Sequence, residues 1–313
     1  MNSIAEKLET GVEVKNILFA TDFSAISQAA LPYVTALSVR YGSTIHVAHV
    51  LPPSVLLRPG APDPAVMGSI YEEVHSAAQE KMQHVAQLLR GFPHKTYVRH
   101  GDVVDVIREL IVDQEIDMLV LGTHGRTGLG RLIMGSFAEE IFRFSGCPVF
   151  TIGPHVPATT HVVESRHTRD LPPPQVAFRQ ILFATDFAPH AAEIASYAVS
   201  LAQEFRTQLT LLHVIDGYGE DLHEHPGPID VALHKLEELV PDHNELLYRP
   251  EFVVEFGTPA EQILRVSDEF EADLIVLGAR AAEGNVRAST HFAKSTAHKV
   301  VVGAHCPVLT IRH

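Results

Sequence analysis

Short apolar runs alternate along the chain with longer stretches in which apolar positions recur at helical spacing. The run Asn16–Ala20 predicts a buried strand, and the next apolar face predicts a single helix that Ser24 caps and Gly42 ends. The same patterns predict strands at Thr44–Val50, Lys95–His100, Ile116–Leu121 and Pro148–Ile152, and helices at Ser69–Arg90, Val103–Asp113 and Ser136–Phe144. This alternation predicts an α/β fold, with a mostly parallel sheet covered by helices on both faces.

The second half of the chain repeats the first. The octapeptide NILFATDF at residues 16–23 recurs at 180–187 with only its first residue changed. The correspondence continues in the pairs His49 and His213, Val50 and Val214, Asp117 and Asp273, Gly122 and Gly278, and Cys147 and Cys306. We therefore expect two tandem, doubly wound domains, residues 1–154 and 177–313. Residues 155–176 between them are polar and end near three prolines, which predicts an extended linker.

Composition narrows the class of protein. The 313 residues suit two domains of about 150 residues each, and a net charge of −14 disfavours binding to nucleic acid or to an anionic membrane. No apolar run reaches the roughly 18 residues that span a bilayer, and the first ten residues lack the pattern of a secretory signal. Cys147 and Cys306 each precede a proline at a strand start, which indicates buried, inert thiols. We expect a cytoplasmic protein.

Glycines after one predicted strand indicate a phosphate site. Gly122 and Gly125 follow the run at 116–121, and Gly135 and Ser136 begin a predicted helix. Small residues let a ligand approach the backbone, and the free N–H groups of a helix start favour an anion. Ser136 and Glu139 also have the spacing of a capping box, so a purely structural role for Ser136 stays equally open.

Other strand ends supply further candidates for the same crevice, because ligands of such sheets bind beyond the carboxyl ends of the strands. Asp22 follows the first strand, where its carboxylate can accept from ribose hydroxyls or can form a turn. Val50 ends the second strand and suits either an adenine face or the core. His124, Arg126 and Arg131 are candidate cations, although exposed arginines are usually only solvated.

The sequence lacks several other signatures. The first strand–helix turn, FATDFS, contains no glycine, which excludes the dinucleotide fingerprint, and no Walker A, His-Glu-x-x-His or Gly-x-Ser-x-Gly motif occurs. His223 and His225 form the densest histidine cluster, which we interpret as a solvated loop, so no metal site is expected.

At these residues the chain resembles the universal stress protein family in its tandem two-domain form. The family motif of Gly, two residues, Gly, nine residues, Gly and Ser or Thr is matched by Gly122, Gly125, Gly135 and Ser136. The resemblance implies a five-stranded parallel sheet between helices in each domain, pairing of the domains through their last strands, and binding of ATP with or without Mg²⁺. The implied nucleotide-binding residues are Ala20, Asp22, Val50, Leu121, Gly122, His124, Gly125, Gly135, Ser136 and Phe137.

The second copy departs from this motif. Asp186 and Gly278 remain, but Ala281 and Lys294 replace the other two glycines, and the stretch from Gly278 to the cysteine is three residues longer. We expect the second copy to bind ATP weakly or not at all, with Lys294 either reaching toward Asp186 or lying on an exposed face.

Three functions follow from these features. The leading hypothesis is an ATP-binding stress or signalling module that pairs its domains within the chain and can form a homodimer. A slow ATPase or phosphotransferase is the second, since no positioned base or paired metal carboxylate accompanies the glycines. A scaffold that binds no nucleotide is the third.

Overall fold

The computed structural model describes residues 12–53, 64–123, 141, 145–157, 162–163, 175–176, 178–216, 227–240, 246–279 and 295–312. Within them, the first half contains strands β1 (Asn16–Ala20), β2 (Thr44–Leu51), β3 (His94–His100), β4 (Met118–Gly122) and β5 (Val149–Ile152). Its described helices are α2 (Ala25–Ala29), α3 (Leu31–Tyr41), α4 (Pro64–Leu88) and α5 (Val103–Asp113).

The second half repeats this order of elements. Its described strands are β8 (Gln180–Thr185), β9 (Gln208–Ile215), β10 (Glu251–Phe256), β11 (Leu274–Ala279) and β12 (Val308–Arg312). Its described helices are α7 (Ala191–Phe205), α8 (Gly227–Glu238), α9 (Pro259–Glu269) and α10 (Thr296–Gly303).

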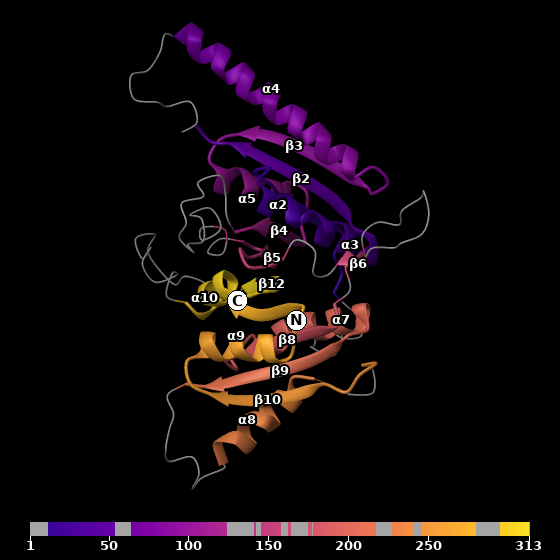
Figure 1. Cartoon of the computed structure of the whole chain (residues 1–313), viewed down its shortest axis with the longest axis vertical. Coiled ribbons are helices and arrows are strands. Elements are labelled where there is room, and N and C mark those ends of the chain that lie inside the picture. Colours follow the sequence, from indigo (N-terminus) through magenta and orange to yellow (C-terminus); the bar gives the residue numbers. More distant parts are fainter. Residues whose placement is uncertain are drawn as a thin grey trace.

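The main strands form one continuous sheet that runs the length of the molecule (Figure 1), in the order β10-β9-β8-β11-β12-β5-β4-β1-β2-β3. Neighbouring strands are parallel within each half, and β5 and β12 pair antiparallel where the halves meet. The predicted α/β fold is therefore confirmed, with five parallel strands in each half. The order reverses between β1 and β4, and again between β8 and β11, which are the positions where such sheets bind ligands.

Both faces of the sheet are buried, because successive side chains of a strand point to opposite faces. Ile17 and Phe19 belong to one apolar cluster and Leu18 and Ala20 to the other. The first cluster is covered by side chains of α3, α4, α7 and α8, and the second by those of α5, α9 and α10. Each cluster contains residues from both halves, so the core is continuous across the junction.

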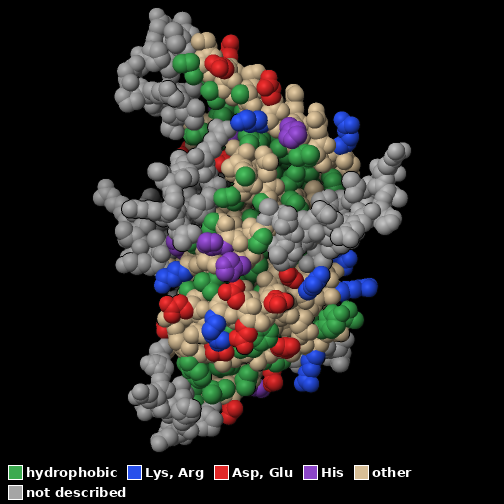
Figure 2. Space-filling model, viewed as in Figure 1, with side chains coloured by type: hydrophobic (Ala, Val, Ile, Leu, Met, Phe, Trp, Pro, Cys, Tyr) green, Lys and Arg blue, Asp and Glu red, His purple; other side chains and the backbone are tan. Residues whose placement is uncertain are grey.

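Aromatic and polar contacts add to the junction between the halves. The ring of Tyr33 on α3 lies 5.7 Å from that of Phe150 on β5 and 6.4 Å from that of Phe178, which precedes β8. Arg40 on α3 forms a 2.9 Å ion pair with Glu204 on α7. On the face shown in Figure 2, histidine side chains gather where the halves meet.

Backbone packing at the junction leaves no room for a side chain at Gly153. A Cβ atom there would lie 2.7 Å from the carbonyl oxygen of Val301 on α10. The first half therefore approaches the backbone of the second half directly.

Within the described residues the predicted elements agree with the structure in most places, and two differ. The helix predicted at Ser136–Phe144 lies outside the described residues except for Ile141. The single helix predicted after Ser24 is two helices, α2 and α3, which meet at Ala30. Pro32 stands in the first turn of α3, where its missing N–H is tolerated, and this position favours a new helix start. Within the predicted linker, β6 (Val162–Val163) and β7 (Gln175–Val176) pair antiparallel, so this segment returns on itself.

Candidate functional site

The carboxyl ends of β1, β2 and β4 bring three predicted site residues together. Ala20 pairs in register with Ala48 of β2 and with Leu121 of β4. Ala20, Val50 and Leu121 are all buried and belong to the same apolar cluster. They form an apolar wall at the point where the strand order reverses.

The turn after β1 has a strained backbone that the second half repeats. Phe23 has φ of 61° and Phe187 has φ of 57°, a left-handed conformation that is unusual for a bulky residue. Thr21 holds the turn, because its Oγ1 accepts from the Phe23 N–H at 3.0 Å and its carbonyl lies 2.7 Å from His49 Nδ1. Thr185, Phe187 and His213 make the corresponding contacts in the second half at 3.1 and 2.9 Å.

Asp22 lies within this turn with one carboxylate oxygen used and one unused. Its Oδ1 accepts from the backbone N–H of Ser24 at 2.9 Å, which is the turn-forming role expected of an aspartate. Its Oδ2 is buried and has no hydrogen-bond partner among the described residues. Because an unpaired buried oxygen is costly, this atom points to a donor supplied by a ligand.

Gly122 is needed for packing as well as for the predicted access to the backbone. A Cβ atom on Gly122 would lie 3.2 Å from Cγ2 of Ile26 and 3.2 Å from the backbone nitrogen of Ser27. The end of β4 therefore lies directly against α2, and a larger residue would push that helix away. No local pattern in the sequence predicts this contact, because it depends on two segments about a hundred residues apart.

Five of the predicted site residues cannot be placed on this frame. His124, Gly125, Gly135, Ser136 and Phe137 lie outside the described residues, as do Arg126, Arg131 and, in the second half, Ala281 and Lys294. The structure brings together Ala20, Asp22, Val50, Leu121 and Gly122.

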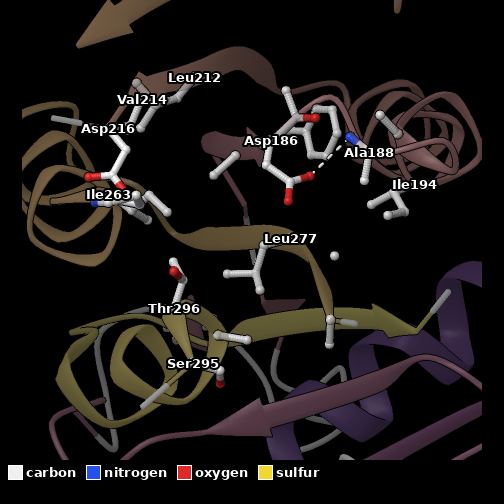
Figure 3. A pocket seen from close by; sticks show the side chains of 18 residues that line it. Asp186, Ala188, Ile194, Leu212, Val214, Asp216, Ile263, Leu277, Ser295 and Thr296 are labelled. Carbon is white, nitrogen blue, oxygen red and sulfur yellow. Dashed lines mark hydrogen bonds between the residues drawn. The ribbon is translucent and has the colours of Figure 1, made fainter. Parts of the chain in front are cut away.

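The second half contains a cavity of about 510 Å³ at the corresponding edge of the sheet. Figure 3 shows Asp186 and Asp216 beside it, with Leu277 between them and with Ser295 and Thr296 on the opposite side. Three of the lining residues, Asp186, Val214 and Gly278, are the counterparts of Asp22, Val50 and Gly122.

A different segment after the first strand accompanies this cavity. In the first half, Ile26 on α2 lies against Gly122. Its counterpart is His190, whose side chain is 53% exposed and lies 3.6 Å from Glu193. Pro189 precedes it, and α7, which takes the place of both α2 and α3, begins at Ala191, two residues later than the counterpart of the α2 start. The cavity is lined here by Ala188 and Ala191.

A family model of the universal stress proteins matches residues 13–153 and 177–312. The chain belongs to the universal stress protein family. The two matched regions coincide with the two halves of the sheet, which explains why the sequence and the structure both repeat.

Relatives of known name occur both as single and as tandem units. A universal stress protein of Methanocaldococcus jannaschii is 26% identical over 155 residues, which make up 45% of this chain and 96% of the relative. A universal stress protein of Mycobacterium bovis is 24% identical over 305 residues, which make up 95% of this chain and 96% of the relative. The crystal structure of a universal stress protein from Archaeoglobus fulgidus has a TM-score of 0.66 at 21% identity and covers 96% of this chain and 99% of that chain, which supports the fold.

The two cysteines of this universal stress protein are buried and have a structural role. Cys147 and Cys306 are free and buried, as predicted, and burial raises the pKa of the Cys306 thiol to about 12. Burial also raises the pKa of the Cys147 thiol, so neither forms a thiolate readily. Among the described residues, no three His, Cys, Asp or Glu side chains are grouped as a metal site, and His223 and His225 lie outside this part of the chain.

None of the helices in the described segments has both the length and the apolar character needed to cross a membrane.

One acidic residue at the cavity escaped the sequence analysis. Asp216 directly follows β9, whereas its counterpart after β2 is Pro52. Comparison of the two copies position by position would have found it, since both stand just beyond a strand end.

Proposed function

We propose that the first half of this universal stress protein binds ATP at the carboxyl ends of β1, β2 and β4. The buried Oδ2 of Asp22 carries this proposal, since it needs a donor and stands at the point where the strand order reverses. A ribose hydroxyl would supply that donor. The apolar wall of Ala20, Val50 and Leu121 suits the adenine ring.

The intact glycine motif supports the phosphate part of the proposal. Gly122 ends β4, so the chain leaves the sheet beside Asp22 and continues into Gly125, Gly135 and Ser136. Backbone amides at these small residues would hold the phosphates, with His124 and Phe137 completing the set around the nucleotide. Such a cradle matters in a chain of net charge −14, because the rest of the surface repels an anion.

ATP would act here as a signal. A ligand shifts a conformational or association equilibrium only by its different affinity for the two states. The fold offers an element for such a shift, because α2 lies against Gly122 at the proposed site and α3, the next helix, contacts the second half. We propose a cytoplasmic module whose association with partners depends on ATP, with slow hydrolysis at most.

The antiparallel pairing of β5 and β12 uses the last strand of each half within one chain. We take the linker as residues 155–176 and the two domains as 1–154 and 177–313. A homodimer of this protein would therefore form through another surface, such as the outer strands β3 and β10.

The proposal is tested by ligand content and by thermal stability. Mass spectrometry of the small molecules released from purified protein should find adenine nucleotide, and added MgATP should raise the melting temperature, because binding stabilises by RT ln(1 + [L]/Kd). Absence of both results would favour the scaffold, and turnover above about 1 s⁻¹ would favour an enzyme.

A pair of variants locates the site. Gly135→Asp should abolish the stabilisation by MgATP, because it places a negative side chain at the predicted phosphate position. Gly146→Asp is the matched control, since Gly146 is exposed and a Cβ atom there meets nothing within 4 Å. Normal ATP binding by Gly135→Asp would mean that the site is misplaced.

A further inference from the structure

The cavity of the second half has the size of a ligand site, and its described lining contains one carboxylate more than the corresponding positions of the first half. Its volume of about 510 Å³ lies within the range of small-molecule pockets, roughly 300–1,000 Å³. It opens at the carboxyl ends of β8, β9 and β11, where the order of the strands reverses (Figure 3). Position and size therefore both favour a bound small molecule.

Two carboxylates flank this cavity. Asp186 extends from the turn after β8 and Asp216 follows the end of β9, and both line the cavity (Figure 3). Asp186 Oδ1 also accepts from the backbone N–H of Ala188 at 3.0 Å. No lysine or arginine is among the described residues that line it, and Arg280, Arg287 and Lys294 of the intervening segment lie outside the described part of the chain. Because Asp22, the counterpart of Asp186, stands at the proposed ATP site, Asp216 is the carboxylate that sets this cavity apart. Its charge would repel a triphosphate more strongly in a partly enclosed site than in water.

Among the described residues, the helix start that borders the cavity favours an anion, and it is partly capped by the protein itself. The N-terminus of α10 borders the cavity through Ser295, Thr296 and Ala297. The Oγ of Ser295 accepts from the backbone N–H of His298 at 3.2 Å, so one of the free amides of this helix start is already satisfied. The helix start therefore offers a ligand fewer N–H donors than an uncapped helix would.

The other walls are apolar and suit a flat ring. Ile194, Leu212, Val214, Ile263 and Leu277 line the space between the carboxylates and α10. Carboxylates opposite an apolar wall are suited to a ligand whose hydroxyls donate hydrogen bonds and whose ring packs on aliphatic side chains.

We infer that the second half binds an uncharged, hydroxyl-bearing ligand of nucleoside size, without phosphates, and that Asp216 selects against phosphorylated forms. The acid at this position belongs to the second half alone, since Pro52 is its counterpart in the first. The chain would thus bind a nucleotide in its first half and an unphosphorylated ligand in its second.

The experiment uses the full chain carrying Gly135→Asp together with Asp22→Ala, so that the first half lacks both its phosphate position and its ribose acceptor, with adenosine as the probe. Calorimetry should find one adenosine per chain, binding at least about tenfold more tightly than ATP, with an affinity that does not change with salt because the probe is uncharged. Equal or tighter binding of ATP, or no binding of adenosine at millimolar concentration, would overturn the inference. Tighter binding of spermidine than of adenosine would also overturn it, because the cavity would then select positive charge.

Two substitutions identify the selecting residue. Asp216→Asn, added to the same chain, should weaken adenosine binding about tenfold, because one charged acceptor is lost. It should also reduce the difference in affinity between adenosine and ATP. Asp230→Asn removes the same charge from an exposed position on α8 and should leave both affinities within about twofold. Circular dichroism checks that each variant is folded, and equal effects of the two substitutions would assign the selectivity to net charge rather than to Asp216. The ATP experiment on the unmodified first half is separate, so either proposal can fail alone.

Discussion

At the end of its first strand each half of the chain makes the same left-handed turn, with a phenylalanine at φ of 61° or 57°. In each half a histidine contacts the carbonyl of the threonine two residues before that phenylalanine. Beyond this turn the halves diverge. In the first half α2 begins at once and lies against Gly122, whereas in the second half the helix starts later and a cavity is present.

Both copies of the fold therefore keep the strained turn at Phe23 and Phe187, although the segments that follow it differ. A left-handed non-glycine residue persists only where neighbouring contacts enforce it, and those contacts are present in both halves. A lysine also lies over each ring, Lys81 at 6.0 Å from the centroid of Phe23 and Lys235 at 5.3 Å from that of Phe187. The turn is therefore shared, whereas the residues around it differ between the halves.

The largest expected effect concerns the contact that joins the halves. Gly153→Ala should lower the free energy of unfolding by about 2 kcal/mol or more, because its Cβ would lie 2.7 Å from the Val301 carbonyl, which is backbone and can only shift. Urea denaturation measures the change. Gly146→Ala, in open space, should stay within about 0.5 kcal/mol, and an equal loss in both variants would show that the halves are not so closely packed.

A second comparison concerns two equivalent carboxylates, Asp117 and Asp273, which bind the backbone at the starts of β1 and β8. Asp117 Oδ2 accepts from the backbone N–H groups of Lys15 and Asn16, and Asp273 Oδ2 accepts from those of Arg179 and Gln180. Replacement by alanine leaves two amides unpaired, so Asp273→Ala should cost about 2 kcal/mol in denaturant unfolding. Asp117 is less buried, so its replacement should cost less, and the reverse order would contradict the comparison.

A third, smaller effect distinguishes α2 from α7, the helices that follow the shared turn. The Oγ of Ser24 accepts from the Ser27 N–H at the start of α2, so Ser24→Ala should destabilise by about 1 kcal/mol in thermal or urea unfolding. Ala188→Ser is the matched reverse change and should have almost no effect, since α7 begins only at Ala191. A clear gain from Ala188→Ser would mean that the second half can form the missing helix start.

The smallest effect is a pH dependence that only the first half should show. His46 is buried between Asn16 and Tyr97, and burial, followed by the charge of Lys95, lowers its pKa. The folded state thus disfavours the proton that the unfolded chain takes up below about pH 6.5. Stability from this site is present above that pH and is lost as the pH falls through the lowered pKa.

The counterpart of His46 is Thr210, which occupies the same register in β9 and cannot titrate. In His46→Thr, the stability difference between pH 7.5 and pH 5 in urea unfolding should shrink. An unchanged difference would show that His46 does not contribute to it.

Much of the fold could be predicted from the sequence because its elements are encoded locally. The boundaries of β1 and α5 agree with the prediction, as both have clear apolar periodicity and α5 has Asp102 as its N-cap. The break between α2 and α3 was missed because the apolar face continues through it and only Pro32 marks it. The placement of Asp22, Val50 and Gly122 at one edge was predicted, whereas the glycine motif beyond them remains a prediction.

By itself the sequence determined the repeat, the parallel order of elements within each half and the residues that follow the strand ends, because these depend on periodicity and on short connections. Only the tertiary structure decided that β5 and β12 merge the halves into one sheet, that Asp22 Oδ2 has no described partner and that two carboxylates flank a cavity in the second half. Each of these depends on distances between side chains far apart in the chain, which no local pattern encodes.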